Sequence, residues 1–158
     1  MRSMRPISSM VLLGIWLGGF TACAPVLLMN TPVSKTADGW SITLGQVKEG
    51  PNEYVGEGGV LVTSDAGENL IWTVVTVRNE SGQEAEFSYD TCALEGKGAS
   101  RQPVVVDRHA EINAVTDRSE TIAPGQDRTR QLIYMFPKDQ RPTRMKCDKI
   151  VLPIQKPR

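Results

Sequence analysis

Short stretches in which apolar and polar residues alternate recur along this chain, and no long segment has the spacing of an amphipathic helix. In the clearest stretch, Trp40, Ile42 and Leu44 alternate with Ser41 and Thr43. Successive side chains of a strand point to opposite faces, so this alternation predicts a strand with one apolar face. A chain built mainly from such segments is expected to fold as packed sheets.

Similar segments follow, separated by turn residues at 65–67 and 79–82. The Gly- and Glu-rich residues 48–59 are expected to form a long loop. Strands are predicted at residues 60–63, 70–78, 85–91, 103–107, 120–122, 129–136 and 145–154, and the first two of these are expected to pair as a hairpin. Together with the strand that begins at Trp40, these short segments predict an all-β fold, an antiparallel β-sandwich of about seven strands.

The N-terminus has the organisation of an export signal. Arg2 and Arg5 precede an apolar stretch at residues 10–20, and small residues then lead to Cys23. As a helix this stretch would reach only about 16 Å, roughly half the thickness of a bilayer's hydrocarbon core. We therefore expect it to be cleaved rather than to span the membrane.

Two cleavage sites compete at this signal. Ala22 and Ala24 fit ordinary secretory cleavage after Ala24, but that cut would place Pro25 next to the scissile bond, where its fixed φ fits an extended protease subsite poorly. The segment also resembles a bacterial lipobox, although Phe20 replaces the usual aliphatic residue. The resemblance implies that Cys23 receives a diacylglycerol and becomes the first residue of the mature chain.

This resemblance implies a domain organisation and a location. Residues 1–22 are the signal peptide, residues 23–38 are the lipidated cysteine with a tether, and residues 39–158 are a single domain. Two or three acyl chains on Cys23 would anchor the protein stably in the lipid bilayer. In such lipoproteins, an aspartate directly after the cysteine favours retention in the inner membrane. Here that position is Ala24, so we expect the outer membrane. Residues 26–29 are more apolar than a tether usually is. The alternatives for this segment are a first edge strand or a segment that lies against lipid.

Export also affects the two remaining cysteines. With Cys23 lipidated, Cys92 and Cys147 are an even pair in an oxidising compartment, and we expect them to form a disulfide. Two separate buried thiols are the alternative. Closing a loop of about 55 residues would remove on the order of 4 kcal/mol of unfolded-chain entropy.

Charge is nearly balanced overall but uneven along the chain. Without Arg2 and Arg5, 16 Lys and Arg remain against 18 Asp and Glu, so nothing demands a nucleic-acid partner. Residues 127–158 carry nine basic and three acidic side chains, whereas residues 38–68 carry six acidic side chains and Lys48. The basic segment could face anionic lipid or an acidic partner, or the two segments could lie together and neutralise each other.

The common signatures of catalysis are missing from the sequence. It has one histidine and no motif typical of nucleophilic, redox, zinc or phosphate chemistry, so we expect no enzyme and no cofactor. Asp107, His109 and Glu111 would lie on one side of a strand and could then hold a divalent metal. Alternating charges in a polar connector are more typical of a solvated face, so no metal site is expected there.

Four segments resemble an immunoglobulin-like domain of unknown function that recurs in extracytoplasmic bacterial lipoproteins. They are residues 40–44, 75–79, 122–125 and 132–137, and the resemblance extends over most of the mature chain. It implies an immunoglobulin-like β-sandwich and no particular chemistry. The tryptophan that antibody domains place between their bridged cysteines is missing, and Met145 replaces the tyrosine of their tyrosine corner.

Together these features predict a bacterial lipoprotein of the outer membrane that faces the periplasm or the cell surface. We expect a non-enzymatic binding or assembly module that holds an envelope protein or polymer through a sheet face, an edge strand or the long loop. The alternative is a periplasmic accessory lipoprotein that binds a small ligand or a divalent metal.

Overall fold

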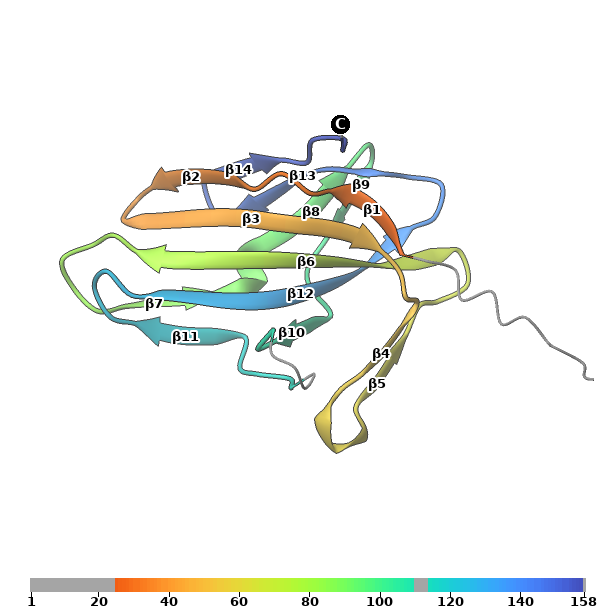
Figure 1. The fold of residues 1–158 in the computed structure, drawn as a ribbon, viewed down its shortest axis with the longest axis horizontal. Helices are drawn as coiled ribbons and strands as arrows, with labels where there is room; N and C mark the ends of the chain where they lie inside the picture. Colours follow the sequence, from red (N-terminus) through yellow and green to blue (C-terminus); the bar gives the residue numbers. More distant parts are fainter. Residues whose placement is uncertain (1–24, 110–113, 158) are drawn as a thin grey trace, which may run out of the picture.

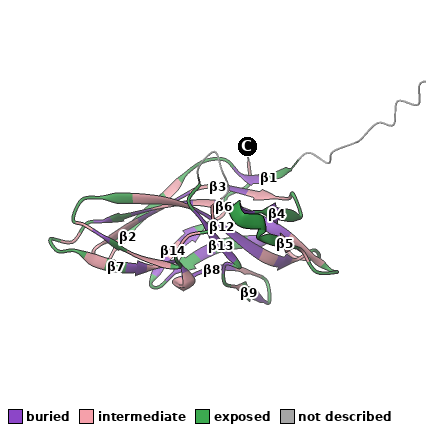
Figure 2. Ribbon diagram, turned by 90° about the horizontal axis from the view of Figure 1, so that it is seen from below, coloured by how far each residue is buried: buried purple, intermediate pink, exposed green. Residues whose placement is uncertain are grey.

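A computed structural model describes residues 25–109 and 114–157 of the chain. These residues contain fourteen strands and two short 3₁₀ helices. All paired strands are antiparallel, and they form two main layers (Figures 1 and 2). The predicted all-β, immunoglobulin-like sandwich is confirmed, with more and shorter strands than the seven expected. No helix in the described ranges is long and apolar enough to cross a membrane.

The larger layer is a six-stranded sheet in the order β1-β3-β6-β12-β10, with β2 beside β1 along the same edge of β3. Strand β6 is central and is paired with β3 on one side and with β12 on the other. The strands of this sheet are β1 (Val26–Met29), β2 (Val33–Ala37), β3 (Trp40–Glu49), β6 (Glu68–Asn79), β10 (Val105–Asp107) and β12 (Asp127–Pro137).

The second layer is a four-stranded sheet in the order β14-β13-β8-β9, accompanied by the separate pair β7 and β11. Its strands are β7 (Ala85–Ser88), β8 (Cys92–Gly96), β9 (Ala99–Arg101), β11 (Ser119–Ile122), β13 (Pro142–Cys147) and β14 (Ile150–Pro153). The helix η2 (Tyr89–Thr91) joins β7 to β8.

A small hairpin projects from the sandwich as an arm (Figure 1). It consists of β4 (Glu53–Val55), η1 (Glu57–Gly59) and β5 (Leu61–Thr63). The backbone at its turn has positive φ at Gly58 and Gly59, a conformation that favours glycine. The glycines of this segment therefore form a turn rather than the long loop predicted from composition.

The alternation of side chains along β6 divides the apolar residues between two clusters. Ile71, Val75 and Val77 point into the main core between the layers, and Leu70 and Trp72 point to the other face of the large sheet. On that face they form a smaller cluster beneath the arm. Four aromatic residues of the sheets and of η2 are buried, namely Trp72, Tyr89, Tyr134 and Phe136.

A disulfide within the second layer and a hydrogen bond between the two layers meet at Cys92. Cys92 on β8 lies directly opposite Cys147 on β13, and the two form a disulfide across a Cα–Cα distance of 4.0 Å, which confirms the predicted bridge. Tyr134 on β12 donates its hydroxyl to the carbonyl oxygen of Cys92 at 2.8 Å. Burial raises the pKa of Tyr134 above its usual range, so this hydroxyl remains a donor at physiological pH.

Residues 26–37, predicted to belong to a tether, instead form β1 and β2. Both strands are paired with β3, with Val26 opposite Glu49 and Ala37 opposite Trp40. The side chains of Leu28 and Met29 are buried in the main core. Prolines at 25 and 32 flank β1 and do not prevent pairing, so the alternative of an edge strand at residues 26–29 is the correct one.

Three other strand predictions are wrong in detail. Residues 61–63 pair with β4 rather than with β6. The single strand predicted at residues 145–154 is the hairpin of β13 and β14, and β8 and β9 were not predicted. The segment 85–91 is a strand only as far as Ser88, because η2 follows it. In the predicted strands 145–154 and 85–91, a short turn or 3₁₀ helix interrupts a run that looks continuous in the sequence.

Replacing Cys92 and Cys147 together by serine should reduce the free energy of unfolding by about 4 kcal/mol, because the unfolded chain regains the freedom of a 55-residue loop. Chemical denaturation of the oxidised wild type and the double variant measures the difference. A reduced wild type should resemble the variant. Equal denaturation midpoints for all three samples would contradict a structural role for the bridge.

Candidate functional site

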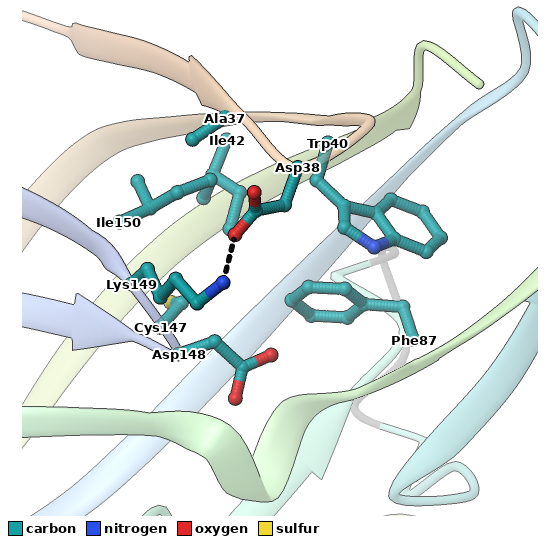
Figure 3. Close-up of a pocket in the computed structure, with 9 residues that line it drawn as sticks. All are labelled: Ala37, Asp38, Trp40, Ile42, Phe87, Cys147, Asp148, Lys149 and Ile150. Atoms are coloured by element: carbon teal, nitrogen blue, oxygen red, sulfur yellow. Dashed lines mark ion pairs between the residues drawn. The ribbon is translucent and has the colours of Figure 1, made fainter.

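A cleft with a volume of about 460 Å³ opens at one end of the sandwich. Two hairpin turns border it, one from each layer: the β2–β3 turn at Asp38 and the β13–β14 turn at Asp148 and Lys149. Figure 3 shows the lining residues, which are Ala37, Asp38, Trp40, Ile42, Phe87, Cys147, Asp148, Lys149 and Ile150.

The floor of this end cleft is apolar and belongs to the main core. Ile42, Phe87, Cys147 and Ile150 are all buried. Trp40 is partly exposed and meets Phe87 edge to face, with ring centroids 5.1 Å apart and an interplanar angle of 65°. The cleft thus presents an aromatic wall whose position is set by packing on both sheets.

Charged side chains form the rim. The Lys149 ammonium lies 3.1 Å from the carboxylate of Asp38, and these side chains are 81% and 60% exposed. Asp148 is exposed on the same rim, and no cation within the described ranges lies at ion-pair distance from its carboxylate. Exposed ion pairs contribute little to stability, so the pair between Asp38 and Lys149 opens at small cost.

One border of the cleft has a clear signal in the sequence, and the other has almost none. The Asp-Gly dipeptide at residues 38–39 is typical of a hairpin turn, and both residues have the positive φ that such a turn requires. The turn at Asp148 was missed because residues 145–154 looked like one strand. Its only signal is the two polar residues between Cys147 and Ile150.

The cleft also brings together the oppositely charged segments of the sequence. Lys149 belongs to the basic segment 127–158, and Asp38 belongs to the acidic segment 38–68. Other cations of the basic segment pair elsewhere, with Arg130 2.7 Å from Glu120 and Arg144 2.6 Å from Glu95. The prediction that the two segments neutralise each other is therefore correct at this cleft and does not extend to these two arginines.

Of the three candidate metal ligands, the structure describes Asp107 and His109, and these two have different environments. Asp107 is fully buried and accepts hydrogen bonds from the Tyr54 hydroxyl at 2.5 Å and from the His109 amide at 3.0 Å. His109 is exposed and has a φ of 53°, so strand alternation ends before it. Glu111 lies outside the described residues. Among the described residues, no three His, Cys, Asp or Glu side chains could hold a metal ion together.

Asp107 instead holds the arm against the sheet. Tyr54 and Val62 face each other across the arm and pack onto the cluster around Trp72. Burial, followed by the hydrogen bond to Asp107, raises the pKa of Tyr54 above its usual range. On the opposite face of the arm, Leu61 is 58% exposed. The arm is therefore a second surface where an apolar partner could bind.

The end cleft and the first strand of the described residues, β1, lie at opposite ends of the large sheet. The C-terminal end of β3 pairs with β1, where Val26 lies opposite Glu49. The first residue of β3, Trp40, lies opposite Ala37 at the end of β2. The ten residues of β3, at about 3.3 Å each, separate the two ends by roughly 30 Å. Cys23 lies outside the described residues, three positions before Val26.

Fold and cleft define an antiparallel β-sandwich of immunoglobulin-like character with a small cleft at one end. No protein-family model and no curated protein matches the sequence. A functionally unknown protein from Listeria monocytogenes EGD-e has a similar structure, with a TM-score of 0.55, 11% identity and coverage of 85% of this chain and 88% of that chain. This similarity shows a shared fold.

An uncharacterised β-sandwich protein from Clostridium difficile 630 was also found. It aligns with a TM-score of 0.48 and 13% identity, covering 72% of this chain and 80% of that chain.

Replacing Tyr54 by phenylalanine should lower the free energy of unfolding by about 1–3 kcal/mol, because the buried carboxylate of Asp107 loses its hydroxyl donor. Urea denaturation measures the loss. Val60→Ser is a suitable control, because Val60 is 43% exposed on the same arm, and it should change stability by less than about 0.5 kcal/mol. Equal effects of the two substitutions would show that the bond does not stabilise the arm.

Proposed function

We propose that this chain is a lipoprotein of the bacterial cell envelope that is anchored through Cys23 and works as a non-enzymatic binding module. The observation that carries the proposal is the position of the end cleft, about 30 Å along β3 from the end where Val26 lies. An anchor at one end of the sandwich presents the cleft at the other end, away from the membrane.

The short distance between Cys23 and β1 supports a defined orientation on the membrane. Three residues span at most about 11 Å, so lipid on Cys23 would hold this end of the sandwich against the bilayer. Val26 and Leu27 are 58% and 37% exposed there. Apolar side chains beside an acyl anchor are well placed to contact lipid.

Basic side chains near the same end fit this orientation. A shallow hollow beside Val26 is lined by Lys138 and Arg141, together with Asp139 and Glu49. Arg141 donates to the carbonyl oxygen of Leu28 at 3.1 Å, which fixes it next to β1. Exposed cations attract the anionic surface of a bilayer, although Asp139 and Glu49 reduce this attraction.

The cleft itself supports a binding role. Its volume of about 460 Å³ lies within the range of small-molecule sites, and it combines an apolar wall with a few polar groups at the rim. The binding partner under this proposal is a component of the envelope that carries a group small enough to enter the cleft.

A second candidate function is assembly with an envelope protein through the arm. Leu61 and Val60 are 58% and 43% exposed on a hairpin that projects from the sandwich, a position typical of residues that bind a partner. In this case the cleft would be incidental and the arm would carry the interaction.

Mass spectrometry of the mature N-terminus tests the anchor. We expect a chain that begins at Cys23 with diacylglycerol on sulfur, and a Cys23→Ala variant that is lost from the membrane fraction. An unmodified mature chain that begins at Pro25 would overturn the anchor.

In-cell photocrosslinking tests which surface binds. A photoreactive residue at Lys149 should give specific crosslinks to an envelope component, whereas one at Ser34, which is exposed on β2 away from the cleft lining, should not. Crosslinks from position 61 and none from position 149 would favour the arm. No specific crosslink from any of these positions would contradict a binding module.

A further inference from the structure

The end cleft combines two features that recognise a cation. Trp40 presents a partly exposed ring that packs on the buried ring of Phe87, and Asp38 and Asp148 place carboxylates on the rim at either side (Figure 3). An organic ammonium group gains from both, because carboxylates attract its charge and aromatic faces attract cations through the ring quadrupole. Lys149 is the cleft's one basic side chain against these two acids.

We propose that the end cleft binds a small amphipathic amine, with its ammonium group between Asp38 and Asp148 and its apolar part against Trp40 and Phe87. This inference deepens the proposed function by naming the chemical class of the ligand. It concerns residues that are all described and does not itself depend on lipidation of Cys23.

Lys149 marks the position where the ligand's ammonium group binds. Its own ammonium is 3.1 Å from Asp38, and in Figure 3 its side chain extends from the β13–β14 turn toward the interior of the cleft. A primary ammonium is therefore already accommodated beside this carboxylate. The Lys149 side chain is 81% exposed, so it can leave the cleft for solvent when a ligand enters.

The same arrangement disfavours an anionic ligand. An incoming carboxylate would meet Asp38 and Asp148, and its single favourable partner, Lys149, is already paired. Like charges at short range are repulsive, whereas an amine replaces the lysine ammonium without changing the charge balance at Asp38. The sign of the ligand's charge is thus the most direct property to test.

The apolar floor sets the other requirement. Ile42, Phe87 and Ile150 are buried, and the disulfide residue Cys147 completes the floor. A fully hydrated inorganic cation gains nothing from this surface, whereas an aryl or alkyl group displaces water from it. The ligand is therefore expected to carry an apolar body of a few carbon atoms beyond the ammonium group.

The experiment uses residues 23–158 with Cys23→Ser, which retain every described strand. Three probes of similar shape are compared: 2-phenylethylamine, 2-phenylethanol and 3-phenylpropionate. The mature chain has only two tryptophans, so NMR resolves a Trp40 indole signal in the cleft and a Trp72 signal beneath the arm as an internal reference. We expect saturable shifts of Trp40 with the amine at millimolar concentration, and weaker effects with the alcohol and the carboxylate.

Substitutions at the rim separate the roles of the three charged groups. Asp38→Asn and Asp148→Asn should each weaken amine binding by roughly two- to five-fold, the range of an exposed charge interaction. Lys149→Met should tighten binding by roughly three-fold, because it frees Asp38. Lys146→Met is the matched control, since it removes an exposed cation of β13 outside the cleft lining and should leave affinity unchanged.

The proposal would be overturned by equal or tighter binding of the carboxylate, by loss of binding in Lys149→Met, or by the absence of a saturable Trp40 shift with the amine. A Trp72 shift equal to that of Trp40 would also overturn it, because the probe would then not be confined to the cleft. These outcomes are separate from the mass of the mature N-terminus, so the ligand class and the lipid anchor can fail independently.

Discussion

The register of β6 is the constraint on which the rest of the structure depends. This strand is paired with β3 and β12 along nearly its whole length, so its alternation fixes which residues of three strands face each side of the sheet. Ile71 and Val75 therefore lie in the main core, and Trp72 lies on the opposite face. A shift by one residue would place Trp72 between the layers and remove the surface on which the arm packs.

Much of this arrangement is predictable from sequence because it depends on periodicity. The central strands and the β-sandwich class follow from alternation, and the Cys92–Cys147 pairing was anticipated from the cysteine count together with the expectation of an oxidising compartment. The short strands are not predictable in this way. Three residues such as Leu61–Thr63 are too few to show a period, and their pairing with β4 is decided by packing onto Trp72.

The candidate site was less predictable than the fold for the same physical reason. Asp38 was identifiable as a turn residue, but its partner Lys149 is 111 positions away and meets it only because two hairpins end at the same place. Asp107 shows the opposite case. Its sequence neighbours suggested a solvated or metal-binding face, yet it is buried because Tyr54, from a distant arm, supplies a hydrogen-bond donor.

The end cleft is made chiefly by turns, whereas the sandwich is held together by strands. Asp38, Asp148 and Lys149 are exposed and contribute no side chain to the main core. Substitutions at these positions can therefore alter the charge and shape of the cleft without disturbing the packing around the disulfide. Such a separation lets recognition diverge among related chains while the architecture stays constant, so proteins with this fold need not share a ligand.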